Sequence, residues 1–157
     1  MIVLKKIKIE YKKYFARWWR SKELLKLTSG MVKVIADKEV DRYFNSILES
    51  KTDYHFMIIS NRKIIGHISL NKRRNKWYET QVIIGEKKYR GKGYGSEAIR
   101  LLIKKAQRIK ISKIYLEVRP TNIRAIRAYE HRGFKKVKIM LHPKNRYLPK
   151  TLRMELE

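Results

Sequence analysis

Alternating apolar and polar residues mark most of the strands expected in this chain. Such runs, bounded by polar or turn-forming residues, are typical of strands that bury one face. They cover residues 2–9, 54–60, 63–70, 77–84, 113–118, 134–141 and 152–156. Asn61 and Arg62 form a short turn between the second and third runs, so these two strands are predicted to pair as a β-hairpin.

Apolar residues at helical spacing predict helices in the intervening segments. These helices are expected over residues 12–27, 37–50, 93–108 and 122–132. From Ile99 to Ala106 the apolar positions follow i, i+3, i+4 and i+7, which is the spacing of an amphipathic helix. Residues 28–30 are expected to end the first helix, Asp37 to open the second and Gly133 to cap the last.

The order of these elements predicts the fold class. Consecutive strands favour antiparallel pairing, and the later strand–helix–strand–helix section favours a parallel crossover. We therefore expect an α+β fold, in which a mixed sheet carries helices on its faces. No linker rich in Pro, Gly or Ser divides the chain and no repeat is visible, so residues 1–157 are predicted to form a single domain.

Composition narrows the chemistry. The 157 residues are 43% hydrophobic, which suits a folded domain, and include no cysteine. Disulfides, thiolate nucleophiles and cysteine zinc sites are therefore excluded, and the four histidines are too scattered to predict a metal site. The first residues do not resemble a signal peptide, and no apolar run approaches membrane-spanning length. We expect a soluble cytoplasmic protein without a membrane partner.

The charge is strongly positive. Forty Lys and Arg residues face fourteen Asp and Glu, for a formal net charge of +26. A heavily charged surface of the thermophile type is one explanation, but surface ion-pair networks need both signs. The excess favours polyanionic partners such as nucleotide phosphates, nucleic acid or an acidic protein.

The segment "YRGKGYGSEAI", residues 89–99, places three alternating glycines between a predicted strand and a predicted helix. Glycines allow close backbone approach to a ligand, and a helix start supplies free N–H donors and a positive dipole end. The loop is thus expected to bind phosphate or pyrophosphate. Its spacing matches neither the Walker A loop nor the dinucleotide fingerprint. The alternative is a glycine-rich turn without a ligand.

The pattern Arg90-x-x-Gly93-x-Gly95 resembles the acyl-CoA loop of the GNAT superfamily of N-acetyltransferases, which reads [Q/R]-x-x-G-x-[G/A]. The later segment "YLEVRPTNIRAIRAYEHRGFKK" is similar to the next segment of that family: a strand, an Asn that opens a helix, a Tyr seven residues on, and Gly-Phe before a strand. The resemblance covers residues 54–141. The first helices resemble, more weakly, the ribosomal-protein and small-amine acetyltransferase branch.

The resemblance implies a twisted, mostly antiparallel sheet with helices on both faces, and transfer of an acetyl group from acetyl-CoA directly to a primary amine. It implies that backbone N–H groups of one loop surround the CoA pyrophosphate: Arg90, Gly91, Lys92, Gly93, Tyr94 and Gly95. It also implies a bulge at the end of the preceding strand, where Ile83, Ile84 and Gly85 hold the pantetheine arm and polarise the thioester carbonyl.

The resemblance also assigns catalytic roles. Asn122 matches the residue that contacts the cofactor arm, although an Asn here also suits a helix N-cap. Tyr129 matches the general acid that protonates the CoA thiolate; its alternative is a core tyrosine. Glu79 matches the general base of some members, and its alternative is an exposed cross-strand Glu paired with a nearby Lys. Glu117, on the next strand, is a weaker candidate for the base.

The acceptor is the least determined part. Trp18, Trp19 and Tyr147 are candidates to line its pocket, although aromatic residues at such spacing also suit a core. A basic rim favours a protein N-terminus or lysine on an acidic surface, or a phosphate-bearing substrate, over free polyamines. The resemblance allows a homodimer. Two other functions remain open: a basic nucleic-acid-binding module, and a non-catalytic domain that binds acyl-CoA. Nucleic acid is also a candidate docking partner for an active enzyme.

Overall fold

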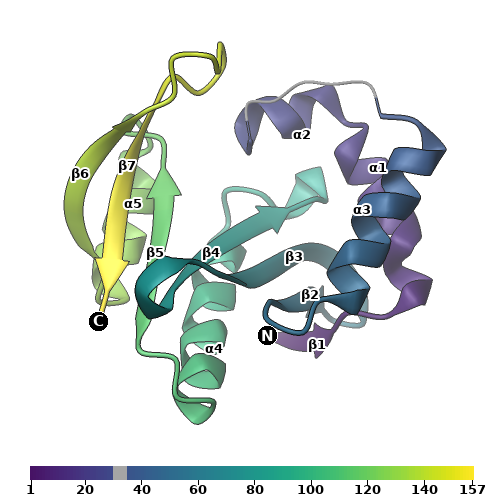
Figure 1. Cartoon of the computed structure of the whole chain (residues 1–157), viewed down its shortest axis with the longest axis horizontal. Helices are drawn as coiled ribbons and strands as arrows, with labels where there is room; N and C mark the ends of the chain where they lie inside the picture. The colour runs from purple at the N-terminus through teal and green to yellow at the C-terminus, as the bar shows by residue number, and fades with distance from the viewer. Residues whose placement is uncertain (30–34) are drawn as a thin grey trace.

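The computed structural model describes residues 1–29 and 35–157, and it contains one seven-stranded sheet with five α-helices (Figure 1). The strands are β1 (Ile2–Lys6), β2 (Tyr54–Ser60), β3 (Lys63–Lys72), β4 (Trp77–Ile84), β5 (Lys113–Val118), β6 (Lys135–Leu141) and β7 (Lys150–Leu156). The helices are α1 (Lys12–Trp19), α2 (Lys22–Leu27), α3 (Asp37–Glu49), α4 (Tyr94–Arg108) and α5 (Ile123–His131).

The sheet is mostly antiparallel, as predicted. Its strand order is β1-β2-β3-β4-β5-β7-β6. Only the neighbours β4 and β5 run parallel, and α4 makes the crossover between them. The predicted hairpin is β2–β3, and its register shifts between Ile58 and Ile59.

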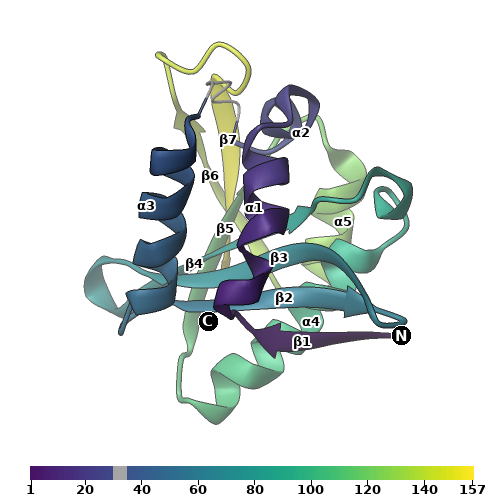
Figure 2. The same ribbon diagram turned by 90° about the vertical axis from the view of Figure 1, so that its right-hand side faces the viewer.

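Helices cover both faces of the sheet (Figures 1 and 2). On one face α4 and α5 bury a core that includes Leu102 and Ile126. On the other, α1 and α3 bury a second core around Phe15 and Phe44. Among the described residues no helix is long and apolar enough to cross a membrane.

The first predicted helix is wrong as a single element, because the chain breaks it at Arg20. The side chain of Ser21 accepts a hydrogen bond from the Leu24 N–H at 3.2 Å and so caps a new helix, α2. The predicted first strand ends at Lys6, and a 3₁₀ turn over Ile9–Tyr11 takes the place of its last residue. The helical segment ends at Leu27, directly before the stop predicted over residues 28–30, of which Gly30 lies outside the described residues.

The sheet opens between β4 and β5. The two strands pair only from Trp77 opposite Lys113 to Glu79 opposite Tyr115. Beyond Glu79, β4 continues beside β3 but no longer pairs with β5. This opening lies at the glycine loop end of β4.

Candidate active site

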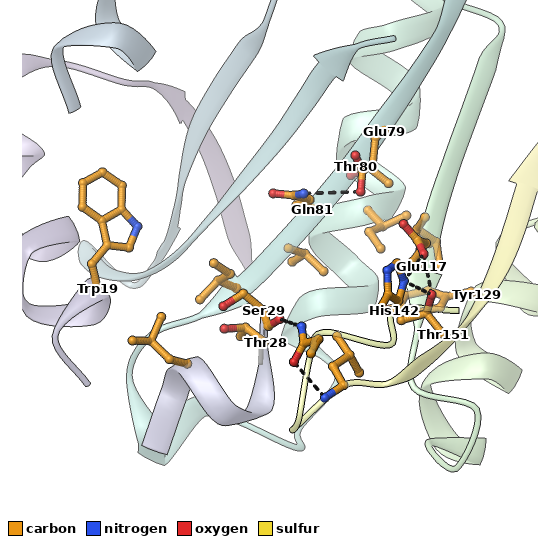
Figure 3. A pocket seen from close by; sticks show the side chains of 17 residues that line it. Trp19, Thr28, Ser29, Glu79, Thr80, Gln81, Glu117, Tyr129, His142 and Thr151 are labelled. Carbon is orange, nitrogen blue, oxygen red and sulfur yellow. Dashed lines mark hydrogen bonds and ion pairs between the residues drawn. The ribbon is translucent and has the colours of Figure 1, made fainter. Parts of the chain in front are cut away.

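A cavity of about 550 Å³ lies at this opening (Figure 3). It is lined from both faces of the sheet. Ile83, which packs with the α1 layer, and Trp19 of α1 line one side. Ile99 of α4 and Tyr129 of α5 line the other. Side chains from the two faces of the sheet therefore meet at this cavity.

The glycine loop presents unused donors beside the cavity. Gly91 has a φ of +69° and Gly93 a φ of +88°, in the left-handed region that favours glycine. Gly93, where the helix was predicted to begin, is the N-cap of α4, and no side chain caps the helix. Within the described chain, the backbone N–H groups of residues 91–95 donate no hydrogen bond to other residues. These donors and the α4 dipole can bind an anion.

Arg90 differs from the rest of its loop. Its backbone N–H donates to the Lys87 carbonyl at 3.1 Å. Its guanidinium donates from Nε to the Ile84 carbonyl at 2.9 Å and from Nη2 to the Gly85 carbonyl at 2.8 Å. Arg90 thus fastens the loop to the end of β4, and the free donors begin at Gly91.

The bulge expected at the end of β4 lies at Gly85 and Glu86. Both N–H groups donate to the Ile65 carbonyl, at 2.8 and 3.2 Å, so two residues oppose one, as in a β-bulge. A Cβ on Gly85 would lie 2.0 Å from the Trp18 ring. Glycine is therefore required here by the packing of Trp18, which is only 4% exposed.

Hydrogen-bond alternation decides which backbone groups of β4 face the opening. The Trp77 carbonyl accepts a hydrogen bond from the Arg73 N–H, one residue past β3, and the Gly85 N–H donates to the Ile65 carbonyl on β3. In an antiparallel pair every second residue bonds to the neighbouring strand in this way. Ile83 therefore also turns its backbone groups toward β3. The N–H groups of Val82 and Ile84 point toward the opening. Of the three residues expected to contact the pantetheine arm, Ile84 alone offers a free backbone donor there.

Tyr129 is brought to the cavity, whereas Asn122 is not. Tyr129 packs edge-on against Phe134, with ring centroids 6.3 Å apart, and its hydroxyl has no hydrogen-bond partner among the described residues. Burial raises the pKa of this phenol. Asn122 caps α5: its Oδ1 accepts from the Ala125 N–H at 3.2 Å.

Glu79 lines the cavity, but both of its carboxylate oxygens are occupied. Arg73 donates to Oε2 from Nε at 3.0 Å and from Nη2 at 2.7 Å. The Tyr115 hydroxyl lies 3.4 Å from the same oxygen, and Gln81 donates to Oε1 at 3.3 Å. The Glu79 side chain is 13% exposed and forms an ion pair with Arg73. The alternative given by the sequence, an exposed Glu paired with a lysine, therefore had the wrong partner and the wrong degree of exposure.

Glu117 also lines the cavity and keeps one oxygen free. His142 Nε2 lies 3.1 Å from its Oε1, and the Thr151 hydroxyl donates to that oxygen too (Figure 3). Its Oε2 has no partner in the part of the chain that the structure describes. The sequence indicated Tyr147 in the same region of the chain, but no spacing signal singled out His142 or Thr151.

The cavity is electrostatically unlike the surface. Its described lining residues include Glu79, Glu117 and His142 but no Lys or Arg. A protein of net charge +26 therefore keeps its cations out of this space. Across residues 1–29 and 35–157, no three His, Asp or Glu side chains gather in a metal-binding group.

Two segments distant in sequence close over the cavity. Leu25, Thr28 and Ser29 line it from the α2 end, and His142, Asn145 and Leu148 line it from the β6–β7 loop. Asn145 Nδ2 donates to the Ser29 carbonyl at 2.9 Å, which joins the two walls.

Arg119 makes a second bridge between the same two segments. It donates from Nη1 to the Tyr147 carbonyl at 2.6 Å and from Nη2 to the Lys26 carbonyl.

Of the three aromatic residues proposed for an acceptor pocket, Trp19 alone lines the cavity. Trp18 packs under Gly85. Tyr147 lies at the bridge, with Lys26 Nζ 5.2 Å from its ring centroid.

Comparison with known proteins identifies the family. The sequence model described as the Acetyltransferase (GNAT) family matches residues 14–134. An N-alpha-acetyltransferase 30 of Dictyostelium discoideum is 35% identical over 86 residues, which cover 53% of this chain and 46% of that protein. An uncharacterized protein of Methanocaldococcus jannaschii is 28% identical over 92 residues, covering 57% of this chain and 19% of that one. The chain thus spans less than half the length of these relatives.

Solved structures show the same fold. A spermidine N-acetyltransferase from Vibrio cholerae, in complex with CoA and spermine, aligns with a TM-score of 0.84 at 18% identity, covering 99% of this chain and 94% of that one. An acetyltransferase (GNAT family) from Bacillus anthracis aligns with a TM-score of 0.79 at 18% identity, covering 99% and 93%. With the family match over residues 14–134, these findings establish that the chain belongs to the GNAT family of acetyltransferases.

Proposed function

We propose that this chain is an acetyl-CoA-dependent N-acetyltransferase, that residues 1–157 act as one domain, and that its acceptor is the amino terminus of a polypeptide. The observation that carries the proposal is the cavity at the β4–β5 opening. It joins free backbone donors on β4 to a tyrosine on one side and a carboxylate on the other.

Acetyl-CoA is expected to enter from the glycine loop side. The free N–H groups of residues 91–95 suit its pyrophosphate. The pantetheine arm then extends along β4, and the Ile84 or Val82 N–H can bond the thioester carbonyl. A preorganised donor of this kind stabilises the developing oxyanion by a few kcal/mol.

The acceptor amine is expected to enter from the side of α2 and the β6–β7 loop, where Glu117 lies. Because Oε2 of Glu117 is free and both oxygens of Glu79 are occupied, we assign Glu117 as the general base. It accepts the ammonium proton, directly or through water, and the neutral amine attacks the thioester carbon. The C–S bond then breaks, and the thiolate takes a proton from the Tyr129 hydroxyl. The nitrogen gives up its second proton, which returns through water to the Tyr129 phenolate, so the products are a neutral amide, free CoA and one proton held by Glu117.

A polypeptide amino terminus fits this site better than a polyamine. An α-amino group has a reference pKa of about 7.7–8.0, against about 10.4 for a lysine amine, so it loses its proton far more readily near neutral pH. Trp19, Leu25 and Leu148 offer apolar walls for a first side chain. The charge of +26 around the cavity repels polycations and attracts an acidic segment that follows the amine. The N-alpha-acetyltransferase relative is consistent with this acceptor.

The test is acetyl transfer from radiolabelled acetyl-CoA to three acceptors: a peptide with a free α-amine and an acidic continuation, the same peptide with a blocked α-amine and one lysine, and spermidine. We expect label on the free α-amine and little on the other two. Transfer to spermidine alone would contradict the acceptor. Acetyl-CoA binding without transfer to any amine would favour the non-catalytic acyl-CoA-binding domain.

Nucleic-acid docking and a cytoplasmic location remain predictions. The first is tested by the salt dependence of binding to an unrelated RNA duplex. A steep fall with salt is expected if exposed lysines and arginines contact phosphates. A homodimer also remains a prediction, which sedimentation of the whole chain tests.

A further inference from the structure

Two cationic side chains at the glycine loop have no part in the chemistry above. Lys92 lies in the loop itself, and Arg124 lies in the first turn of α5; both are exposed. Neither side chain forms an ion pair or hydrogen bond with another described residue. Nearby cations do have partners: Arg132 lies 3.5 Å from Glu97.

Arg124 stands against the first glycine of the free-donor segment. A Cβ on Gly91 would lie 3.6 Å from Nη1 of Arg124. A Cβ on Gly93 would meet no atom within 4 Å. The loop therefore has open space at the start of α4 and a guanidinium beside that space, next to Gly91.

These two places suit two different phosphate groups. The open space at Gly93 has the helix dipole and the free N–H groups, so it suits the pyrophosphate. Coenzyme A carries a third phosphate on its ribose 3′-oxygen, a few bonds from the pyrophosphate. A phosphate monoester is nearly a dianion at neutral pH, and a guanidinium binds it through two parallel hydrogen bonds.

We infer that Arg124, which stands against Gly91, binds the 3′-phosphate of coenzyme A in a second phosphate site next to the pyrophosphate site, and that Lys92, the residue after Gly91, adds positive charge there. The inference rests on the proposed function, because it assumes that acetyl-CoA occupies the loop. It makes the chain selective for cosubstrates that carry this phosphate. A general positive field would not be selective, since it would attract any polyanion.

The test measures affinity by calorimetry at about 0.15 M ionic strength, where exposed charges more than about 8 Å apart are largely screened. The ligands are acetyl-CoA, 3′-dephospho-acetyl-CoA, and ATP as a polyanion without the 3′-phosphate. The proteins are the full chain, Arg124→Gln and the matched control Arg127→Gln. Arg127 lies one turn further along α5, is exposed, and likewise has no side-chain partner among the described residues.

We expect the unaltered chain to bind acetyl-CoA at least about tenfold more tightly than the dephospho form, as for one charged hydrogen-bonded contact. Arg124→Gln should weaken acetyl-CoA alone and close most of this gap, whereas Arg127→Gln should preserve it. Three outcomes would overturn the inference. Arg124→Gln could weaken the binding of acetyl-CoA and of the dephospho form equally, or it could leave the difference in affinity between them unchanged. Alternatively, Arg124→Gln and Arg127→Gln could reduce that difference by the same amount. Failure of the unaltered chain to bind acetyl-CoA better than ATP would instead contradict the proposed function.

Discussion

The two sides of the cavity are built in different ways. On the cofactor side, the donors come from consecutive residues 91–95 and the start of one helix. On the acceptor side, Trp19, Glu117, His142 and Thr151 come from α1, β5, the β6–β7 loop and β7. The cofactor side is formed by consecutive residues, so its geometry depends mainly on local backbone conformation. The acceptor side brings together residues far apart in the sequence, so it forms only when the sheet has folded. Variation of the acceptor side can therefore change the substrate without disturbing the cosubstrate site.

The largest effect is expected from Gly93→Glu, which acts on the cofactor side alone. The new side chain would put a carboxylate and its bulk into the open space where we place the pyrophosphate. Acetyl-CoA affinity should fall at least about 100-fold, which corresponds to about 2.7 kcal/mol, by calorimetry.

Gly93→Ala is the matched control, because it shares the backbone strain of a φ of +88° without the charge. It should lose about 1 kcal/mol of folding stability and keep most of its affinity for acetyl-CoA. Unchanged affinity in Gly93→Glu would remove the loop from the binding site.

The same contrast explains what could be predicted from the sequence. The start of α4 and the bulge after β4 both involve local glycines, and they lie within about a residue of where the sequence pattern and the family resemblance placed them. The environments of Glu79 and Glu117 were not predicted, because they depend on register. Glu79 is opposite Tyr115, and Glu117 is opposite Arg153 on β7, which places Thr151 nearby. Strand patterns give the face of a residue but not its neighbour across the sheet.

The hydrogen-bond partners of Arg90 and Ser21 were also not predicted, because the sequence pattern allows each of these residues more than one role. Arg90 belongs to the phosphate-loop pattern, yet its guanidinium binds two carbonyls of the β4 end. Ser21 broke a helix that apolar spacing alone predicted to continue, because its hydroxyl caps the Leu24 N–H. Neither choice is visible from spacing, since both depend on which backbone groups remain unpaired after folding.

Tyr129→Phe should give the next largest effect, at the junction of the two sides. It removes the hydroxyl to which we assign protonation of the thiolate, and it leaves the ring packed against Phe134. Turnover should fall about 100-fold, and acetyl-CoA affinity should stay within about twofold, by steady-state kinetics and calorimetry. Equal turnover would exclude this phenol as the general acid.

Acid should lower the stability of the whole chain through His67, which lies on the α1 face of the sheet. This residue is buried under α1, where its ring packs edge-on against Phe15 at 4.9 Å and its Nε2 lies 3.0 Å from His55 Nδ1. Burial, with the neighbouring His55, lowers the pKa of His67 to about 3, from about 6.5 in the unfolded chain. The unfolded state therefore binds the extra proton between these values, and stability is lost as the pH falls through that window.

Urea unfolding should show this loss as a decrease of about 2 kcal/mol in the free energy of unfolding between pH 7 and pH 5. His67→Gln should flatten this slope, whereas His131→Gln, on the exposed side of α5, should keep it. An identical slope in the unaltered chain and His67→Gln would show that other groups set the acid stability.

The smallest effect, and the sharpest comparison within the acceptor side, is expected from the pair Glu117→Gln and Glu79→Gln. Both substitutions remove one carboxylate from the cavity, so both change its charge equally. Glu117→Gln should lower turnover about tenfold at pH 7 and less at pH 9, because an α-amino group of pKa about 8 then deprotonates without a base. Glu79→Gln should lower stability, because Arg73 loses its partner, while turnover keeps the same pH profile. If the pH-dependent loss instead followed Glu79→Gln, the base would be the carboxylate held by Arg73. The free oxygen of Glu117 would then have no role in proton transfer.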